Sequence, residues 1–363
     1  MKILIIDNQF NGAYGSLKKF VIEIAYEFRK MGHTVYLTKE MSEAIAIYQL
    51  KTIDFSLGLG KYNYYSDGRA LYDIYKIMHY QWIIDNPYKM QIDVNSKFIK
   101  YIMIDKMFEK CVLPVQNRIL IQPLGVADDI VRREETSNRI RGIVFSGQIK
   151  NVNDIYADIS VHRFKKKIIQ VIDSVMEHLD VPYITVFNER MKAWEDDNKR
   201  EVFRLSNSYI RAYKRTRVIT QIKQYPIYLI GEVHNKEITT KANVTLVGSV
   251  KYERVFDRMR EYMFSLNIEP NFNTGFHDRA LRTVLNGNIL ITNLGSEQEK
   301  FYGRNAIYYK YTDIDEIERN INQWQENDIV HSRKVLEKKV RKYFGWDVVL
   351  GRIIKEFKEK RNG

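Results

Sequence analysis

Residues 2–38 alternate between short apolar runs and one amphipathic stretch. The run at 2–7, KILIID, predicts a strand. Ser16 can cap a helix with apolar residues at helical spacing: Leu17, Phe20, Val21, Ile24 and Phe28. Gly32 ends this helix, and residues 34–38, TVYLT, form the next strand. The order strand, helix, strand predicts a parallel sheet with a right-handed crossover.

The alternation continues along the chain. Strands expected at 53–59, 78–84, 98–104 and 118–122 complete an N-terminal Rossmann-like domain, residues 1–135. Apolar periodicity is lost and charge is gained after Gly125, which marks a linker. A second domain, residues 141–334, has helices near 164–179 and 190–224 and strands at 143–146, 183–187, 227–230, 244–247, 264–268 and 289–292. Strands closed by glycine and followed by helices predict a doubly wound sheet.

Residues 335–363 carry apolar side chains at helical spacing and predict one or two amphipathic helices broken near Gly345. We expect them to cross the joint between the domains and to pack back on the N-terminal domain. Two doubly wound domains in series predict a cleft lined by the carboxyl ends of both sheets, where ligands of such sheets bind.

The segment 273–293, NTGFHDRALRTVLNGNILITN, predicts a polar loop, a short helix, a glycine stop and a buried strand. A glycine loop entering a helix presents free N–H groups and the positive end of the helix dipole to an anion such as a diphosphate. His277 and Arg279 could add donors or charge there. An ordinary turn of an α/β domain explains the same pattern, so the local sequence leaves both interpretations open.

The chain has 363 residues and a formal charge of +13, with 45% hydrophobic residues. This is a globular composition. Basic clusters at 163–167, 211–217 and 334–342 are interleaved with apolar residues, as on the solvated face of a helix. Contact with an anionic substrate or with an anionic membrane is the next interpretation, and nucleic-acid binding is the least favoured.

No apolar run is long enough to span a bilayer, so we expect a cytoplasmic protein. The lone Cys111 excludes an internal disulfide.

From residue 211 onward the chain resembles the CgeB-like (spore maturation protein-like) bacterial glycosyltransferases, which have the GT-B fold and are related to family 4 glycosyltransferases. The resemblance is carried by IRAYKR (210–215), IYLIGE (227–232), NVTLVGSVKY (243–252), FSLNIEPNFNTGFHDR (264–279) and NGNILITN (286–293). HYQWIIDNPY (79–88), Asp105 and ILIQPLG (119–125) extend it more loosely over the N-terminal half.

The resemblance implies a donor site for a UDP, GDP or dTDP sugar in the second domain. The implied diphosphate and sugar contacts are Gly275, Phe276, His277, Asp278 and Arg279, bordered by Asn267 and Asn271. Thr292, Asn293 and Leu294 would offer backbone groups near the nucleotide, and the loops at Gly231 and Gly248 would frame the base. For each glycine a plain strand-to-helix turn is the competing interpretation.

One position departs from the family pattern. Where related enzymes have a Glu that accepts hydrogen bonds from the ribose hydroxyls, this chain has Arg282, which accepts none. Either the ribose is held from elsewhere, or Arg282 turns outward, or the protein has lost its donor.

Glycosyl transfer requires charge that stabilises the departing diphosphate and, where needed, a base for the acceptor hydroxyl. The expected phosphate partners are Arg279, Arg211 and Lys214, with no metal and no cofactor, although Arg211 also fits a solvated helix face. The candidate bases are Asp7, Asp85 and His79; a turn-capping role explains Asp85 equally well.

The sequence therefore predicts a metal-independent glycosyltransferase, hexosyltransferase-like, that moves a sugar from a nucleotide-sugar donor to a cell-surface glycan or a protein. The alternative is a non-catalytic GT-B protein that has lost donor chemistry and uses its cleft or basic face to bind a partner.

Overall fold

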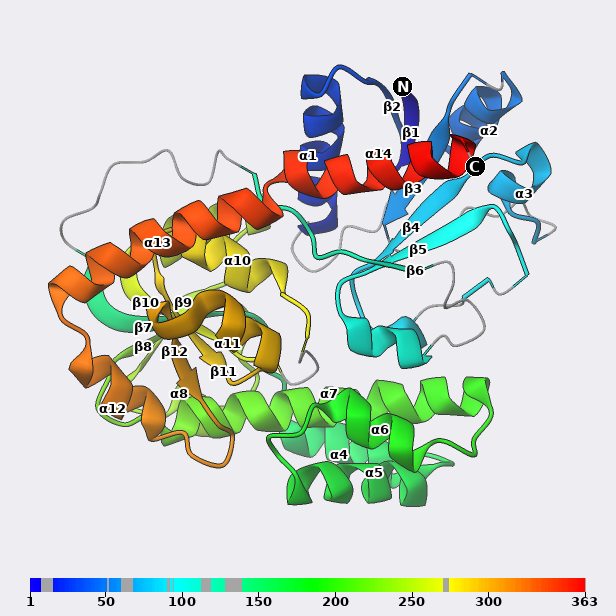
Figure 1. Cartoon of the computed structure of the whole chain (residues 1–363). Coiled ribbons are helices and arrows are strands. Elements are labelled where there is room, and N and C mark those ends of the chain that lie inside the picture. The colour runs from blue at the N-terminus through cyan, green and yellow to red at the C-terminus, as the bar shows by residue number, and fades with distance from the viewer. Residues whose placement is uncertain are drawn as a thin grey trace. The chain divides into compact units, whose positions relative to one another are not determined.

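The computed structural model describes residues 1–7, 16–50, 52–59, 68–89, 92–93, 95–111, 119–127, 139–269 and 274–362. The chain divides into two units (Figure 1). Unit 1 comprises Met1–Ala127 and Arg341–Gly363, and unit 2 comprises Asp128–Val340. In the part of the chain that is described, no helix is long and apolar enough to cross a membrane.

Unit 1 is built on a parallel six-stranded sheet of order β2-β1-β3-β4-β5-β6. Its strands are β1 (Lys2–Ile6), β2 (Thr34–Thr38), β3 (Phe55–Leu59), β4 (His79–Ile83), β5 (Ile99–Met103) and β6 (Ile119–Ile121). Its first helices are α1 (Ser16–Lys30), α2 (Met41–Gln49) and α3 (Leu71–Tyr75), with 3₁₀ turns at Pro87–Lys89 and Lys106–Cys111. Every residue of β3, β4 and β5 is buried, as expected of central strands covered on both faces, and the buried residues include the polar Ser56, His79, Gln81 and Lys100.

A helix that follows unit 2 in the chain completes unit 1. Helices α13 (Glu326–Phe344) and α14 (Trp346–Asn362) are separated at Gly345, and α14 packs against α1 (Figure 1). Trp346 Nε1 donates to Glu23 on α1 at 2.8 Å. Farther along α14, Glu356 accepts a hydrogen bond from Tyr80 and pairs with Lys100. These partners are on strands β4 and β5, so α14 is tied to both the sheet and α1.

Unit 2 contains the second parallel six-stranded sheet, of order β12-β11-β10-β7-β8-β9. The strands are β7 (Ile140–Ser146), β8 (Ile227–Ile230), β9 (Val244–Gly248), β10 (Tyr262–Asn267), β11 (Ile289–Asn293) and β12 (Ile307–Tyr309). Read from its edge at β9, this is the Rossmann order 3-2-1-4-5-6, whose direction of winding reverses between β7 and β10. The predicted pair of doubly wound parallel sheets is thus confirmed.

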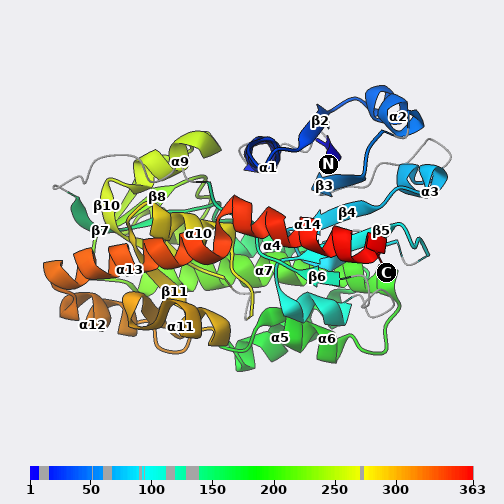
Figure 2. The ribbon, with the colours of Figure 1, turned by 45° about the horizontal axis from the view of Figure 1, so that its top comes forward.

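Four helices connect β7 to β8: α4 (Val152–Ser160), α5 (Lys165–Glu177), α6 (Tyr183–Arg190) and α7 (Asp196–Gln221). Figure 2 shows the first three gathered along the N-terminal half of α7. The strand predicted at 183–187 is wrong, because these residues form α6. Tyr183 and Phe187, one helical turn apart, both pack on Phe203 of α7, which a strand could not arrange.

The remaining helices of unit 2 are short. They are α8 (Lys236–Thr239), α9 (Tyr252–Met259), α10 (Asp278–Leu285), α11 (Ser296–Tyr302) and α12 (Glu316–Gln323), with a 3₁₀ turn at Gly303–Asn305. Most of the predicted linker, residues 128–138, lies outside the described residues.

Candidate functional site

The candidate site lies at the carboxyl ends of β7 and β10, the neighbouring strands between which the winding reverses. In open α/β sheets, ligands bind outside the carboxyl ends of the strands at such a reversal. Gly147 directly follows β7, and Glu269 follows β10. Helix α10 begins beside this edge.

His277 caps the N-terminus of α10. Its Nδ1 accepts a hydrogen bond from the backbone N–H of Arg279 at 3.2 Å, and this satisfies one of the free donors of the first turn. The loop before it is held by Gln298, whose Nε2 donates to the Gly275 carbonyl at 2.9 Å. The Phe276 ring packs edge-on against Phe301 at 5.1 Å, so this residue anchors the loop.

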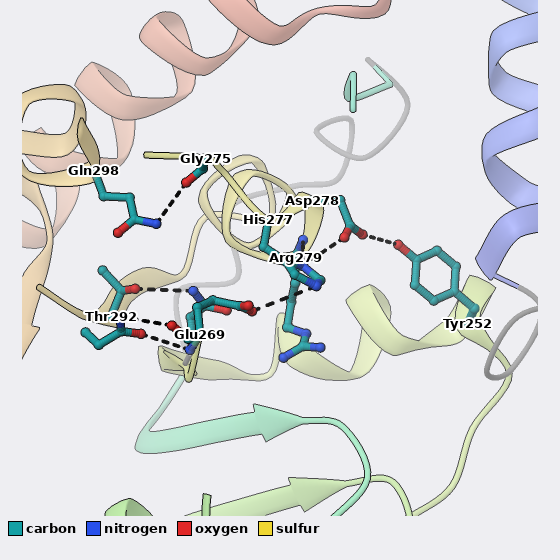
Figure 3. Close-up of polar contacts among 10 residues, drawn as sticks. Tyr252, Glu269, Gly275, His277, Asp278, Arg279, Thr292 and Gln298 are labelled. Carbon is teal, nitrogen blue, oxygen red and sulfur yellow. Dashed lines mark hydrogen bonds and ion pairs between the residues drawn. The ribbon is translucent and has the colours of Figure 1, made fainter. Parts of the chain in front are cut away.

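The His277 ring lies between two carboxylates, as Figure 3 shows. Its Nδ1 is 2.8 Å from Asp278 Oδ1, and its Nε2 is 3.9 Å from Glu269 Oε1. Tyr252 on α9 donates to the other oxygen of Asp278 at 3.0 Å. Burial lowers the pKa of His277, but the charges of Glu269 and Asp278 outweigh it, and the net pKa is raised. Burial likewise opposes ionisation of Asp278, yet the His277 charge and hydrogen bond hold its pKa well below the usual range.

Polar side chains at the ends of β10 and β11 set the shape of this edge. Asn293 accepts from the Glu269 N–H at 2.9 Å and donates to the Glu269 carbonyl at 3.2 Å, which fixes the chain after β10. Asn267 donates to the Thr292 hydroxyl at 3.2 Å, and its own side-chain oxygen is buried with no partner among the described residues. The Leu294 N–H donates to the Tyr309 carbonyl at 2.9 Å. Asn271, also expected here, lies outside the described residues.

Two arginines converge on one buried ring. The guanidinium carbons of Arg215 on α7 and Arg279 on α10 lie 5.6 and 5.9 Å from the centre of the Phe145 ring. Arg215 is 8% exposed, and its Nη1 donates to the Gln148 carbonyl at 2.5 Å. Its Nε and the Nη1 of Arg279 are buried without a hydrogen-bond partner in the described ranges.

This cluster of positive charge is poorly compensated by the protein. Burial, with the charges of Arg211 and Arg279, lowers the pKa of Arg215 well below its usual value, and Glu269 opposes this. Arg211 lies on α7, one helical turn before Arg215, and is half-buried. A partly buried cationic cluster with unfilled donors is suited to bind an anion, because an anion supplies both the missing charge and the missing acceptors.

Lys214 does not join this cluster. Its Nζ donates to the Leu179 carbonyl at 2.6 Å and lies 4.2 Å from the centre of the Tyr311 ring. Burial lowers its pKa to about 7, opposed by Asp180. The structure thus gives Lys214 a place in the core, away from the expected phosphate contact.

The glycine loops after β7, β8 and β9 pack directly on one another. Gly231 has a φ of +135°, and a Cβ there would lie 2.5 Å from the Gly147 carbonyl oxygen. Its N–H bonds the Gly248 carbonyl at 3.0 Å. A side chain at Gly147 would come within 3.9 Å of Arg279 Nη2, so this glycine leaves space beside the guanidinium.

Arg282 is directed inward. It is 1% exposed, and its positive charge contributes to the low pKa of Asp278 one turn earlier on α10. The suggestion that Arg282 turns outward is therefore wrong. It serves as a buried counter-charge for the first turn of α10.

The three candidate bases are all in unit 1 but differ in setting. Asp7 follows β1, is 7% exposed and lies 4.0 Å from Lys39 Nζ. Asp85 is exposed, two residues after β4. His79 begins β4, at the opposite edge, and its ring nitrogens bond Ser56 at 2.8 Å and Gln81 at 3.1 Å. Burial lowers the pKa of His79 to about 4, and the side chain is 2% exposed, so His79 lies in the core of the sheet.

Sequence reasoning overlooked three residues of the site: Arg215, Glu269 and Tyr252. Arg215 is four residues after Arg211, a spacing that places both on one face of a helix. Glu269 comes two residues after strand β10, near a strand end where functional carboxylates are displayed. Nothing local singles out Tyr252, because its role depends on the packing of α9 against α10.

No protein-family model matches the chain, and no curated protein sequence matches it. The fold is similar to that of AviGT4, a glycosyltransferase involved in avilamycin A biosynthesis, with a TM-score of 0.60 and 9% identity over 99% of this chain and 97% of that one. Sucrose-phosphate synthase from Thermosynechococcus elongatus has a TM-score of 0.56 at 8% identity, covering 100% and 99% of the two chains. Anabaena Alr3699/HepE, solved in complex with UDP and glucose, has a TM-score of 0.55 at 10% identity, covering 99% and 100%. The chain thus has the two-domain GT-B fold of these glycosyltransferases.

Proposed function

We propose that this protein is a glycosyltransferase that binds a nucleotide-sugar donor at the carboxyl edge of unit 2. The convergence of Arg215 and Arg279 on the Phe145 ring, with buried donors unfilled, carries the proposal. Glycosyl transfer releases a nucleoside diphosphate from an oxocarbenium-like state, and fixed guanidinium groups stabilise the charge that develops on it. The similar fold of HepE, solved with UDP and with UDP-glucose, supports a nucleotide-sugar donor.

The proposed reaction is metal-independent, because the arginine cluster and the N-terminus of α10 supply positive charge to the leaving group. The donor is a hexose on UDP, GDP or dTDP. Asp7 and Asp85, both after strands of unit 1, are the proposed candidates for deprotonating the acceptor. The loop Gly275–Arg279 supports the finer assignment to CgeB-like enzymes, because it carries the sequence resemblance.

The proposed acceptor is a cell-surface glycan or a protein, modified in the cytoplasm or at the inner face of the membrane. Contact with anionic lipid is supported by the turn between α4 and α5, where Val161 is 86% exposed and Lys165 and Lys166 are also exposed. Cosedimentation with anionic and with neutral vesicles tests this contact.

A second candidate is a binding protein that has the fold but no transferase activity. The buried Arg282 favours it, because that position lacks the carboxylate expected to hold the ribose hydroxyls. The two candidates differ in turnover: only the first cleaves a nucleotide sugar.

The decisive experiment is a thermal-shift screen with UDP, GDP, dTDP and CMP sugars, followed by hydrolysis assays on each sugar that stabilises the protein. At about 100 times Kd a ligand adds about 2.7 kcal/mol of stability, so the melting temperature of a unit of this size should rise by about 5–10 °C. Arg279→Ala should abolish the shift. Arg258→Ala, which removes an exposed arginine paired with Glu261, should leave it intact. The donor-site proposal fails if no nucleotide sugar shifts the melting temperature, and binding without hydrolysis selects the second candidate.

A further inference from the structure

One nitrogen of His277 faces two groups that need it in opposite states. Nδ1 lies 3.2 Å from the backbone N–H of Arg279, which requires a lone pair. The same atom lies 2.8 Å from a carboxylate oxygen of Asp278, which requires an N–H. A ring nitrogen carries either a proton or a lone pair, so these two interactions exclude each other.

Each protonation state leaves a different group unsatisfied. With the proton on Nε2 alone, Nδ1 caps α10 but places its lone pair against the Asp278 carboxylate. With the proton on Nδ1 alone, Nδ1 donates to Asp278, but the lone pair of Nε2 faces the Glu269 carboxylate. With both nitrogens protonated, Nδ1 donates to Asp278 and Nε2–H points toward Glu269, 3.9 Å away. The imidazolium therefore suits both carboxylates, and it leaves the N–H of Arg279 without its cap.

The groups around the ring decide which state prevails. Glu269 follows β10, and Asp278, Arg279 and Arg282 all belong to α10. Tyr252 on α9 donates to the Asp278 carboxylate at 3.0 Å and holds it toward the ring (Figure 3). The two carboxylates favour the imidazolium, whereas Arg279 and burial oppose it, and the pKa of His277 is raised on balance.

We propose that His277 is a positioning residue whose protonation transfers the backbone N–H of Arg279 from the helix cap to the diphosphate of the donor. Nucleotide binding then takes up a proton at His277. This inference rests on the proposed donor site. Tyr252 supports that role by keeping the Asp278 carboxylate beside Nδ1.

The sign of the pH dependence follows from linkage. An anion that accepts from the Arg279 N–H stabilises the imidazolium, so the pKa of His277 is higher in the complex than in the free protein. Affinity is constant at a pH below the pKa of His277 in the free protein, which is raised from its ordinary value by the two carboxylates. Between the two pKa values affinity falls by up to about tenfold per pH unit, and above both it is constant again.

The test is calorimetric titration of the full chain with UDP, and with GDP in parallel, from about pH 7 to about pH 9. In this range the terminal phosphate of the nucleotide, with a pKa of about 6, is ionised and contributes little. Repeating each titration in two buffers of different ionisation enthalpy counts the protons taken up on binding. We expect uptake of up to about one proton and a matching loss of affinity as the pH rises.

His277→Asn is the matched variant, because an Asn side chain accepts the Arg279 N–H as a helix cap but does not titrate. It should bind UDP with no proton uptake and no pH dependence over the same range. His162→Asn is the control: His162 also faces a carboxylate, with its Nε2 3.4 Å from Glu201 Oε2, but it lies between α4 and α5. This control should keep the wild-type proton uptake.

The outcomes separate this inference from the proposal on which it rests. Nucleotide binding with proton uptake that His277→Asn removes supports it. If the wild-type protein binds nucleotide with no proton uptake at any pH, the role of His277 is overturned while the donor site stands. This outcome is read from the wild-type protein alone, so it does not depend on how any variant folds. Proton uptake that persists in His277→Asn also overturns it. Absence of any nucleotide binding refutes the donor site itself.

Discussion

Replacement of Gly231 by Ala tests whether the three glycine loops form one packed unit. A Cβ at Gly231 would lie 2.5 Å from the carbonyl oxygen of Gly147 and 3.0 Å from its carbon, and backbone atoms cannot rotate away as a side chain can. The φ of +135° adds strain for any residue with a Cβ. Strained backbone costs about 1–3 kcal/mol and overpacking about 1–3 kcal/mol, so we expect a loss of about 2–6 kcal/mol.

The assay is the melting temperature of the whole chain, compared with two other glycine variants. At about 2–4 °C per kcal/mol for a unit of this size, Gly231→Ala should lower the melting temperature by at least about 4 °C. Gly248 has a φ of +88°, but no atom lies within 4 Å of an added Cβ. Gly248→Ala should therefore show the cost of backbone strain without the cost of a steric clash. Gly351→Ala, in α14 with open space around it, should stabilise by about 0.5–1 kcal/mol. If Gly231→Ala loses no more stability than Gly248→Ala, the reasoning about loop contact is wrong.

Two further changes probe buried charges. Burial lowers the pKa of Lys214 from 10.5 to about 7. Between these two pH values the unfolded chain binds more protons than the folded chain, so the free energy of unfolding rises with pH. Lys214→Met should remove this rise, as measured by urea denaturation between about pH 7 and about pH 9. Glu356→Gln removes the carboxylate charge that pairs with Lys100, which is 7% exposed, and should destabilise by about 3–5 kcal/mol in chemical denaturation. Glu359→Gln, on the exposed end of α14, should change stability by less than about 0.5 kcal/mol, and equal effects of the two Glu variants would contradict the buried pair.

The strands of both sheets were largely predictable, because most are continuous apolar runs ended by glycine or polar residues. The expected strand at 227–230 coincides with β8, and the break near Gly345 falls between α13 and α14. Residues 183–187 were misassigned because a short apolar run has the same composition in a strand and in a buried helix. The three residues of β12 form too short a run to recognise without the neighbouring strand that pairs with them.

The candidate site was only partly predictable. The loop Gly275–Arg279 stood out because glycine, a capping residue and a helix occur in series. Arg215 and Glu269 did not stand out, because their roles in the site depend on which strands are neighbours at the winding reversal. Strand order is a tertiary property that no local pattern contains. The inward direction of Arg282 likewise depends on the pairing of α10 with β10 and β11.

The return of α14 to unit 1 also bears on biosynthesis. The sheet of unit 1 leaves the ribosome first, but Trp346 and Glu356 are made only after all of unit 2. Until then Glu23 on α1 and the buried Lys100 lack the contacts that α14 supplies. Unit 2 is one continuous stretch of chain and can finish folding while unit 1 is still incompletely covered. The first domain to be translated is therefore the last to be completed, and a chaperone that shields nascent apolar surface would act on it for longest.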